Sequence, residues 1–224
     1  MLFSSSAISR RHFLRNTACM GAAAECLALA HPGPNGCPDP FDSLPHSVWQ
    51  RARNNGLVMI HRPAPAALTS RIDIVSKDGP GKRLIVEGQV LDPAGTPAAG
   101  VTVYAYNTDS EGYYGAGHKE FPPRLFGWMK TDDQGRFELH TILPGHYPGM
   151  HIPAHVHFTA WGRGYPPQWL EELRFQGDPY ITPEMLAEAA RQGEFSSIRP
   201  LTRTKDGVLH CRYQFRIQSE TNFH

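Results

Sequence analysis

Alternating apolar and polar residues predict a series of short strands over most of the chain beyond residue 83. The strands are expected at residues 84–90, 101–106, 135–139, 154–160 and 209–217. Turn-forming residues separate them, as in Asp92-Pro93-Ala94-Gly95 and Thr131-Asp132-Asp133-Gln134. Several short strands at this spacing are typical of an all-β fold, and we expect an antiparallel β-sandwich domain over residues 83–224.

The regions outside this strand series are less regular. Residues 31–82 carry clusters of Pro and Gly and are expected to form an N-terminal arm, with a short helix near residues 47–55 as one option. A helix is predicted after Thr182, because Thr is a good N-cap and Pro183 suits the first helical position. Gly193 is expected to end it. The sandwich is therefore expected to carry one or two short helices.

Composition narrows the classes of function. The chain has 224 residues, of which 40% are hydrophobic, and this is enough for one core of ordinary size. A formal net charge of +1 with 19% charged residues argues against a basic surface for nucleic acid. We therefore expect a small-molecule partner and no nucleic acid.

The first thirty residues have the pattern of an export signal. Paired arginines in Ser9-Arg10-Arg11-His12-Phe13-Leu14-Arg15 precede a weakly apolar stretch that ends at Ala28-Leu29-Ala30. Residues 1–30 are therefore predicted to be a twin-arginine signal peptide, which would place the mature protein in the periplasm or outside the cell. The alternative, favoured by Glu25 within the apolar stretch, is a short amphipathic helix of the mature protein. No later stretch approaches the about 20 apolar residues of a membrane helix, so the mature form is not expected in a membrane.

Export also affects how the cysteines are interpreted. Cys19 and Cys26 would leave with the signal peptide, while Cys37 and Cys211 would remain in an oxidising compartment. A disulfide between these two and a pair of separate buried thiols are both compatible with the sequence, because geometry decides between them.

The segment Pro153-Ala154-His155-Val156-His157-Phe158 carries the sharpest local pattern. Residues two apart on a strand share a face, so His155 and His157 are expected to point to one side and Val156 and Phe158 to the other. Two imidazoles placed in this way can bind one metal ion. Histidines that play a structural role would give the same pattern.

Two tyrosines lie in loops that could present them to the same point. Tyr147 lies in Pro144-Gly145-His146-Tyr147-Pro148-Gly149, a loop bounded by proline and glycine. Tyr114 follows a predicted strand, in Asp109-Ser110-Glu111-Gly112-Tyr113-Tyr114-Gly115. Taken singly, a tyrosine in such a position is more often a core or interface aromatic residue.

Together these motifs resemble the intradiol ring-cleavage dioxygenases, the family of protocatechuate and catechol dioxygenases. The resemblance covers nearly half of the chain, in order, over the segments 86–97, 106–114, 131–137, 141–148, 153–158 and 175–179. It implies Tyr114 as the axial ligand, Tyr147 as the equatorial ligand, and His155 and His157 as the imidazole ligands of one Fe(III) per chain. The implied reaction joins a small aromatic diol and dioxygen to give a muconate-type diacid, and both oxygen atoms enter the product.

The chemistry of the residues agrees with this resemblance. Phenolate is a hard anionic oxygen that suits a hard trivalent cation, whereas zinc sites usually use Cys, His and carboxylate. Since the pKa of tyrosine is ordinarily about 10, the metal must drive deprotonation, and metal binding is coupled to proton release.

Two positions depart from the family pattern. Ile152 stands where the family usually has arginine, and Glu172 stands where it usually has glutamine. Loss of a fixed cation would remove stabilisation of developing negative charge, so these positions bear on substrate and rate. Arg124, Arg174 and His151 are candidates to replace the charge, although a surface or turn location is the simpler expectation for each.

Two other functions compete with this interpretation. Gly149 and the His155-Val156-His157 segment match the opening of a cupin metal motif, but Trp161 and Gly162 stand where that motif needs glutamate, and the strand offers no carboxylate. A transthyretin-like binding sandwich without metal shares the early strand pattern. The sequence leaves open which catechol is the substrate, whether the chain forms homo-oligomers, and what the N-terminal arm does.

Overall fold

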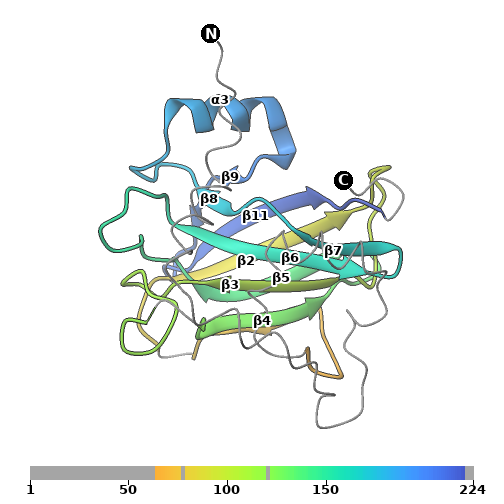
Figure 1. Ribbon diagram of the computed structural model, residues 1–224, viewed down its shortest axis with the longest axis horizontal. Coiled ribbons are helices and arrows are strands. Elements are labelled where there is room, and N and C mark those ends of the chain that lie inside the picture. The colour runs from red at the N-terminus through yellow and green to blue at the C-terminus, as the bar shows by residue number, and fades with distance from the viewer. Residues whose placement is uncertain (1–63, 77–78, 120–121, 220–224) are drawn as a thin grey trace, which may run out of the picture. The chain divides into compact units, whose positions relative to one another are not determined.

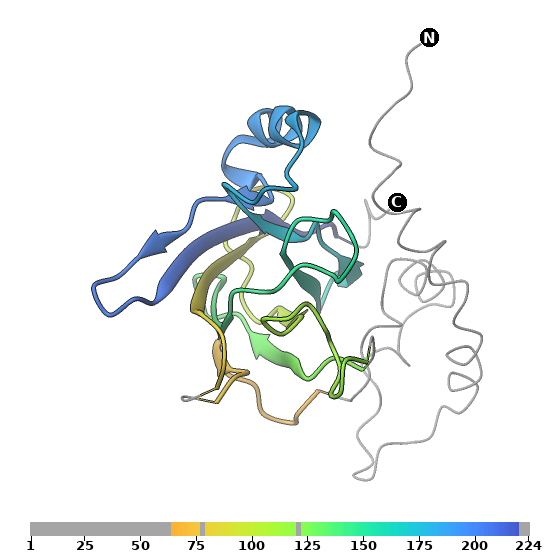
Figure 2. The same ribbon diagram turned by 90° about the vertical axis from the view of Figure 1, so that its left-hand side faces the viewer.

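The computed structural model describes residues 64–219 apart from 77–78 and 120–121, and within them two β-sheets face each other (Figures 1 and 2). The first sheet has the order β1-β5-β2-β11-β10, with β1 Arg71–Asp73, β5 Arg136–Ile142, β2 Arg83–Leu91, β11 Leu209–Arg216 and β10 Thr202–Arg203. The second has the order β4-β3-β6-β8-β9, with β4 Leu125–Lys130, β3 Thr102–Asn107, β6 His155–Gly162, β8 Leu173–Phe175 and β9 Ile198–Arg199. Strand β7, Tyr165–Trp169, pairs with β6.

The strands form where the sequence alternates, because one face of each meets the core between the sheets. In β2 the residues Leu84, Val86 and Val90 are fully buried, while Ile85, Glu87 and Gln89 are partly exposed. The same alternation recurs in β11, with Cys211 and Tyr213 inward. The all-β sandwich predicted from the sequence is confirmed.

Strand β6 is the exception, because nearly all of its residues are buried on both faces. Val156 and Phe158 enter the core between the sheets, as predicted. His155 and His157 point to the opposite face, where they are 7% and 1% exposed. That second face is therefore covered by other parts of the chain, and the candidate site lies there.

The sheets are mixed and not purely antiparallel. Strand β11 runs parallel to β2, β1 runs parallel to β5, and β8 runs parallel to β9. Parallel neighbours need a long connection, and β11 is separated from β2 by almost the whole domain. Local turn patterns carry no information about such pairings, which is why the sequence suggested antiparallel strands alone.

The predicted helix is present as α3, Pro183–Gln192, followed by the short 3-10 helix η5, Gly193–Phe195. The Thr182 hydroxyl accepts a hydrogen bond from the amide of Met185, and Gly193 follows the last helical residue with φ of 58°. Both views place α3 at one end of the sandwich, outside the two layers (Figures 1 and 2).

The predicted N-terminal arm falls only partly within the described residues. Its end contains β1, which extends the first sheet. The predicted signal peptide, the helix option near residues 47–55 and Cys37 lie outside the described residues. Cys211 is a free thiol buried in the core, and burial raises its pKa to about 12. Within the described part of the chain, no helix is long and apolar enough to cross a membrane.

Candidate metal centre

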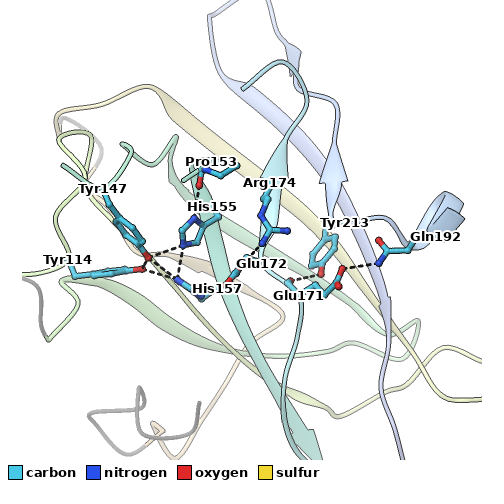
Figure 3. A network of polar contacts seen from close by, with 10 residues as sticks. All are labelled: Tyr114, Tyr147, Pro153, His155, His157, Glu171, Glu172, Arg174, Gln192 and Tyr213. Carbon is cyan, nitrogen blue, oxygen red and sulfur yellow. Dashed lines mark hydrogen bonds and ion pairs between the residues drawn. The ribbon is translucent and has the colours of Figure 1, made fainter. Parts of the chain in front are cut away.

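The polar ends of Tyr114, Tyr147, His155 and His157 meet at one point (Figure 3). The Tyr114 hydroxyl lies 2.8 Å from His157 Nε2, and the Tyr147 hydroxyl lies 2.9 Å from His155 Nε2. The two imidazole Nε2 atoms are 3.0 Å apart, and the two hydroxyls are in direct contact. The structure thus brings together all four residues that the sequence singled out.

A carbonyl oxygen fixes the tautomer of His155. Its Nδ1 lies 2.7 Å from the carbonyl oxygen of Pro153, which can only accept, so Nδ1 carries the hydrogen. Burial lowers the pKa of His155 and lowers that of His157 well below the usual range. The neutral His155 ring therefore directs the lone pair of Nε2 into the cluster, as a metal ligand requires.

Two aromatic rings hold His157 in place. The ring of Tyr106, directly opposite on β3, stacks on it with centroids 4.5 Å apart. The ring of Trp169 lies on it at a tilt, with centroids 5.6 Å apart. Sequence reasoning gave no role to Tyr106 or Trp169, although the alternation of β3 places Tyr106 on the same face as Tyr104. His157 is therefore a rigid side chain.

The loop that carries Tyr114 is organised by Asp109. Its Oδ1 accepts hydrogen bonds from the amides of Glu111 and Tyr113, each at 3.0 Å. Gly112 adopts a φ of 91° in this turn. A Cβ at Gly112 would lie 1.8 Å from the carbonyl oxygen of His146, so the turn has room for glycine only.

The loop that carries Tyr147 is bonded to the Tyr114 loop. The amide of Gly145 donates to the carbonyl of Asp109 at 2.8 Å, and the Thr108 hydroxyl donates to the carbonyl of Gly145 at 2.9 Å. The two tyrosines are therefore held by backbone contacts that do not depend on the tyrosines themselves. This arrangement fixes their spacing before any ligand binds.

A buried carboxylate joins the Tyr147 loop to β6. Asp178 accepts hydrogen bonds from His146 Nε2 at 2.9 Å, from the amide of Ala154 at 3.0 Å and from the amide of Tyr180 at 2.9 Å. Its side chain is 6% exposed. Since His146 precedes Tyr147 and Ala154 precedes His155, Asp178 sets the position of one side of the cluster against the other.

The Asp178→Asn variant tests this connection. Asparagine keeps one acceptor oxygen, but its NH2 group would face an N–H donor that Asp178 now accepts from. We therefore expect a loss of about 2 kcal/mol in the free energy of unfolding. Hydrogen exchange should become faster in the Tyr147 loop. Urea unfolding and amide exchange measure the two effects, with the exposed turn residue Asp133→Asn as the control. An unchanged exchange rate in the loop would contradict the role given to Asp178.

The four residues fit a hard trivalent cation. Burial is the main cause that raises the pKa of Tyr114 and Tyr147 above the usual value, so both phenols keep their protons in the metal-free protein. A cation of high charge can displace those protons and balance the negative charge of the two buried phenolates. Two phenolate oxygens and two imidazole nitrogens are donors that suit Fe(III).

The buried histidines predict that the metal-free protein is sensitive to mild acid. The pKa of each is lowered in the folded state, so the unfolded chain binds more protons below about pH 6.5. Their contribution to stability is complete above that pH and is lost as the pH falls below it, by up to about 1.4 kcal/mol per pH unit for each histidine. Urea unfolding at stepwise pH measures this slope. A slope that is unchanged in the metal-free His155→Gln variant would contradict it.

The two positions that depart from the family pattern have different surroundings. Ile152 is half-buried just before β6, whereas Glu172 forms an ion pair with Arg174 beside the histidines. Among the candidate replacement charges, Arg124 pairs with Asp109 near the surface and His151 is exposed. The expectation that Arg174 faces solvent is wrong. Arg174 lies on β8, which pairs with β6, and its side chain is only 13% exposed.

A carboxylate does lie near the histidines, although β6 itself offers none. A carboxylate oxygen of Glu172 and one ring nitrogen each of His155 and His157 all lie within 4.8 Å of one another. Glu172 precedes β8, the neighbour of β6, and only the pairing of these strands reveals the contact.

Comparison with known proteins decides the family. Residues 58–219, more than two thirds of the chain, match a family model described as Dioxygenase. The chain belongs to the intradiol dioxygenase family. This membership replaces the cupin-like alternative.

Relatives within the intradiol dioxygenase family include two curated proteins. The protocatechuate 3,4-dioxygenase beta chain of Burkholderia cepacia is 31% identical over 154 residues, which are 61% of this chain and 64% of the relative. The catechol 1,2-dioxygenase 1 of Acinetobacter lwoffii is 30% identical over 162 residues, 62% of this chain and 49% of the relative. The chain therefore spans about half to two thirds of the length of these relatives.

Solved structures show the same fold. The catechol 1,2-dioxygenase of Pseudomonas arvilla C-1 aligns with a TM-score of 0.55 at 22% identity, over 93% of this chain and 74% of that one. The dioxygenase domain of a carbohydrate-binding fusion protein from Streptomyces sp. SirexAA-E aligns with a TM-score of 0.51 at 24% identity, over 71% of this chain and 96% of that one. The intradiol dioxygenase sandwich is thus present in this chain.

Proposed function

We propose that this protein is an intradiol ring-cleavage dioxygenase, an oxidoreductase that opens a catechol-type ring with dioxygen to give a muconate-type diacid. One non-haem Fe(III) per chain would be held by Tyr114, Tyr147, His155 and His157. The observation that carries the proposal is the convergence of these four side chains on one point, in a chain of this family. The partners are then a small aromatic diol and dioxygen, and no nucleic acid.

Bound iron would withdraw electron density from a chelated diol and open a ring carbon to attack by dioxygen, without an external reductant. The residues around it have separate tasks. His155 and His157 present neutral nitrogen donors whose orientation is fixed by Pro153 and by the stacked ring of Tyr106. These donors stay in place while the diol binds.

The two tyrosines supply negative charge to the metal, and one of them accepts a proton from the diol. Because burial raises the pKa of Tyr114 well above its usual value, its phenolate is a strong base once it is not bound to a cation. We assign Tyr114 Oη as the acceptor of one diol proton, which leaves the diol as the anion that chelates. Tyr147 stays as the second phenolate, held by the bonds of its loop to Asp109 and Asp178.

The experiment that tests the function starts from protein expressed with iron. We expect one iron per chain, a visible tyrosinate-to-iron absorption band that shifts when a catechol is added, and oxygen uptake with formation of the ring-opened diacid. Catechol, hydroxyquinol and 3,4-dihydroxybenzoate should be compared, because relatives with these substrates in their names are all similar to this chain. A colourless, iron-free protein would reject the proposal and favour a metal-free binding sandwich.

A matched pair of variants separates the centre from the rest of the fold. Tyr147→Phe removes a phenol oxygen of the cluster, and Tyr165→Phe removes one from β7 outside it. We expect the first to lose the band and the activity and the second to keep both.

We also propose that the protein is exported by the twin-arginine route to the periplasm or outside the cell, based on the sequence of residues 1–30. Such export carries folded proteins, so iron can be inserted beforehand. Fractionation of cells that express the full chain and an Arg10→Lys, Arg11→Lys variant tests this, with retention of the variant in the cytoplasm as the expected result.

A further inference from the structure

A half-buried pair of opposite charges lies beside the four converging residues. In the antiparallel pairing of β6 with β8, Arg174 stands directly opposite His155 and Leu173 opposite Val156. Continued by one residue, this register puts Glu172 opposite His157. Side chains of directly opposite residues share a face of the sheet. Both charged residues therefore lie on the face of β6 that carries the two histidines.

Glu172 lies close enough to His155 and His157 for all three to bind one metal ion. One of its carboxylate oxygens and one ring nitrogen each of His155 and His157 all lie within 4.8 Å of one another. Figure 3 shows the Glu172 side chain between His157 and Arg174. The carboxylate thus approaches the histidines from the side of β8, whereas the two tyrosines come from loops.

Arg174 restrains the Glu172 carboxylate. Its Nη2 donates to Glu172 Oε2, and the side chains of Glu172 and Arg174 are only 22% and 13% exposed. One contact of this kind leaves lone pairs of both oxygens for another partner, because a carboxylate has about four acceptor positions. Arg174 Nε is buried and has no hydrogen-bond partner within the described part of the chain. A pair placed here solely for stability would be expected to satisfy its donors.

The charge of Glu172 also bears on a cation bound at the cluster, because a carboxylate oxygen lies within 4.8 Å of a ring nitrogen of each histidine. Two phenolates carry two negative charges, and a trivalent cation would leave one positive charge in a buried site. The Glu172 carboxylate is the nearby group that balances it.

We propose that Glu172 is a fifth protein donor to the metal centre and that Arg174 is the positioning residue that orients it. The proposal rests on the proposed function only in that the site binds a metal. It makes the centre of this chain a set of two phenolates, two imidazoles and one carboxylate. The carboxylate would then supply negative charge that a solvent anion would otherwise have to supply.

The test compares Glu172→Gln with Glu171→Gln in the full chain. The adjacent Glu171 is exposed, and its carboxylate accepts a hydrogen bond from Gln192 at 3.1 Å, away from the histidines (Figure 3). The readouts are the Fe(III) dissociation constant, from competition with a chelator, and the visible band of the substrate-free protein. We expect Glu172→Gln to bind iron at least about tenfold more weakly and to shift the band. Glu171→Gln should match the wild type.

The outcomes separate this proposal from the proposed function. Wild-type protein without iron would reject both. Iron in the wild type with an unchanged band in Glu172→Gln would reject the fifth donor alone, even if the affinity fell, since a distant charge changes affinity without entering the coordination sphere. Circular dichroism and urea unfolding confirm that each variant is folded before its metal affinity is compared.

Arg174→Lys provides a second variant that keeps the charge. Lysine lacks the planar fork that holds a carboxylate in one orientation, so the band should broaden or shift while the net charge stays the same. A band identical to that of the wild type would reject the positioning role of Arg174.

Discussion

Replacing His157 with glutamine is expected to weaken iron binding by more than about 100-fold and to abolish ring cleavage with it. Loss of a group that only orients a ligand costs about 10- to 100-fold in metal affinity, so loss of the ligand itself should cost more. His157 is 1% exposed and contacts the rings of Tyr106 and Trp169, so among the described residues another side chain could take its place only by moving these rings. Metal analysis and oxygen uptake with catechol measure the effect.

A histidine on the other sheet serves as the control for this variant. His210 lies on β11, where its ring nitrogen is 3.7 Å from Glu87. The His210→Gln variant should keep the iron and the activity of the wild type. Equal loss in both variants would mean that the effect comes from the fold, and the ligand role of His157 would have to be abandoned.

The Gly112→Ala variant is expected to lower the free energy of unfolding by about 3 kcal/mol. A non-glycine residue at positive φ costs about 1 to 2 kcal/mol, and overpacking adds about 1 to 3 kcal/mol. Here the φ is 91° and the new Cβ would lie 1.8 Å from the carbonyl oxygen of His146. Relief of that overlap must separate the Tyr114 and Tyr147 loops, so the visible band of the iron-loaded protein should weaken as well.

Gly149→Ala isolates the backbone part of this effect. Gly149 has a φ of 74°, and a Cβ there would meet no atom within 4 Å. Only the conformational cost of about 1 kcal/mol is therefore expected, with an unchanged band. Urea unfolding of both variants gives the comparison. A Gly112→Ala protein as stable as Gly149→Ala would show that the two loops tolerate separation.

Much of the fold follows from local sequence. The alternation of Leu84, Val86 and Val90 predicted β2 to within a residue or two at each end, and Thr182 with Pro183 predicted the start of α3. Short strands such as β8 and β9 were missed, because three residues or fewer are too short for alternation to be visible. The parallel pairing of β2 with β11 depends on tertiary packing that no local pattern records.

The four residues of the centre were predicted as a set from the resemblance to the family, and local patterns gave only partial support for each. His155 and His157 share a strand face by their spacing, and the loops of Tyr114 and Tyr147 are marked by glycine and proline. Their roles as ligands stay a prediction until a metal is measured. Their convergence depends on contacts such as that of Gly145 with Asp109, which the sequence does not reveal.

Glu172 and Arg174 show what local patterns leave out. In the sequence they are two charges in Glu171-Glu172-Leu173-Arg174, which is ordinarily a solvated segment. The register between β6 and β8 turns them toward the histidines. A prediction from the sequence would have needed that register, and β8, with three residues, is too short to be predicted from alternation.

Strand β6 limits how this protein can diverge. One of its faces fills the core through Val156 and Phe158, and the other presents His155 and His157, so a substitution at almost any of its positions disturbs either packing or the centre. New substrate preferences must then arise at positions that approach the strand from elsewhere. Ile152, which lies just before β6 and is not one of the proposed donors, is such a position, and exchanges there offer an engineer a way to alter specificity while keeping the scaffold.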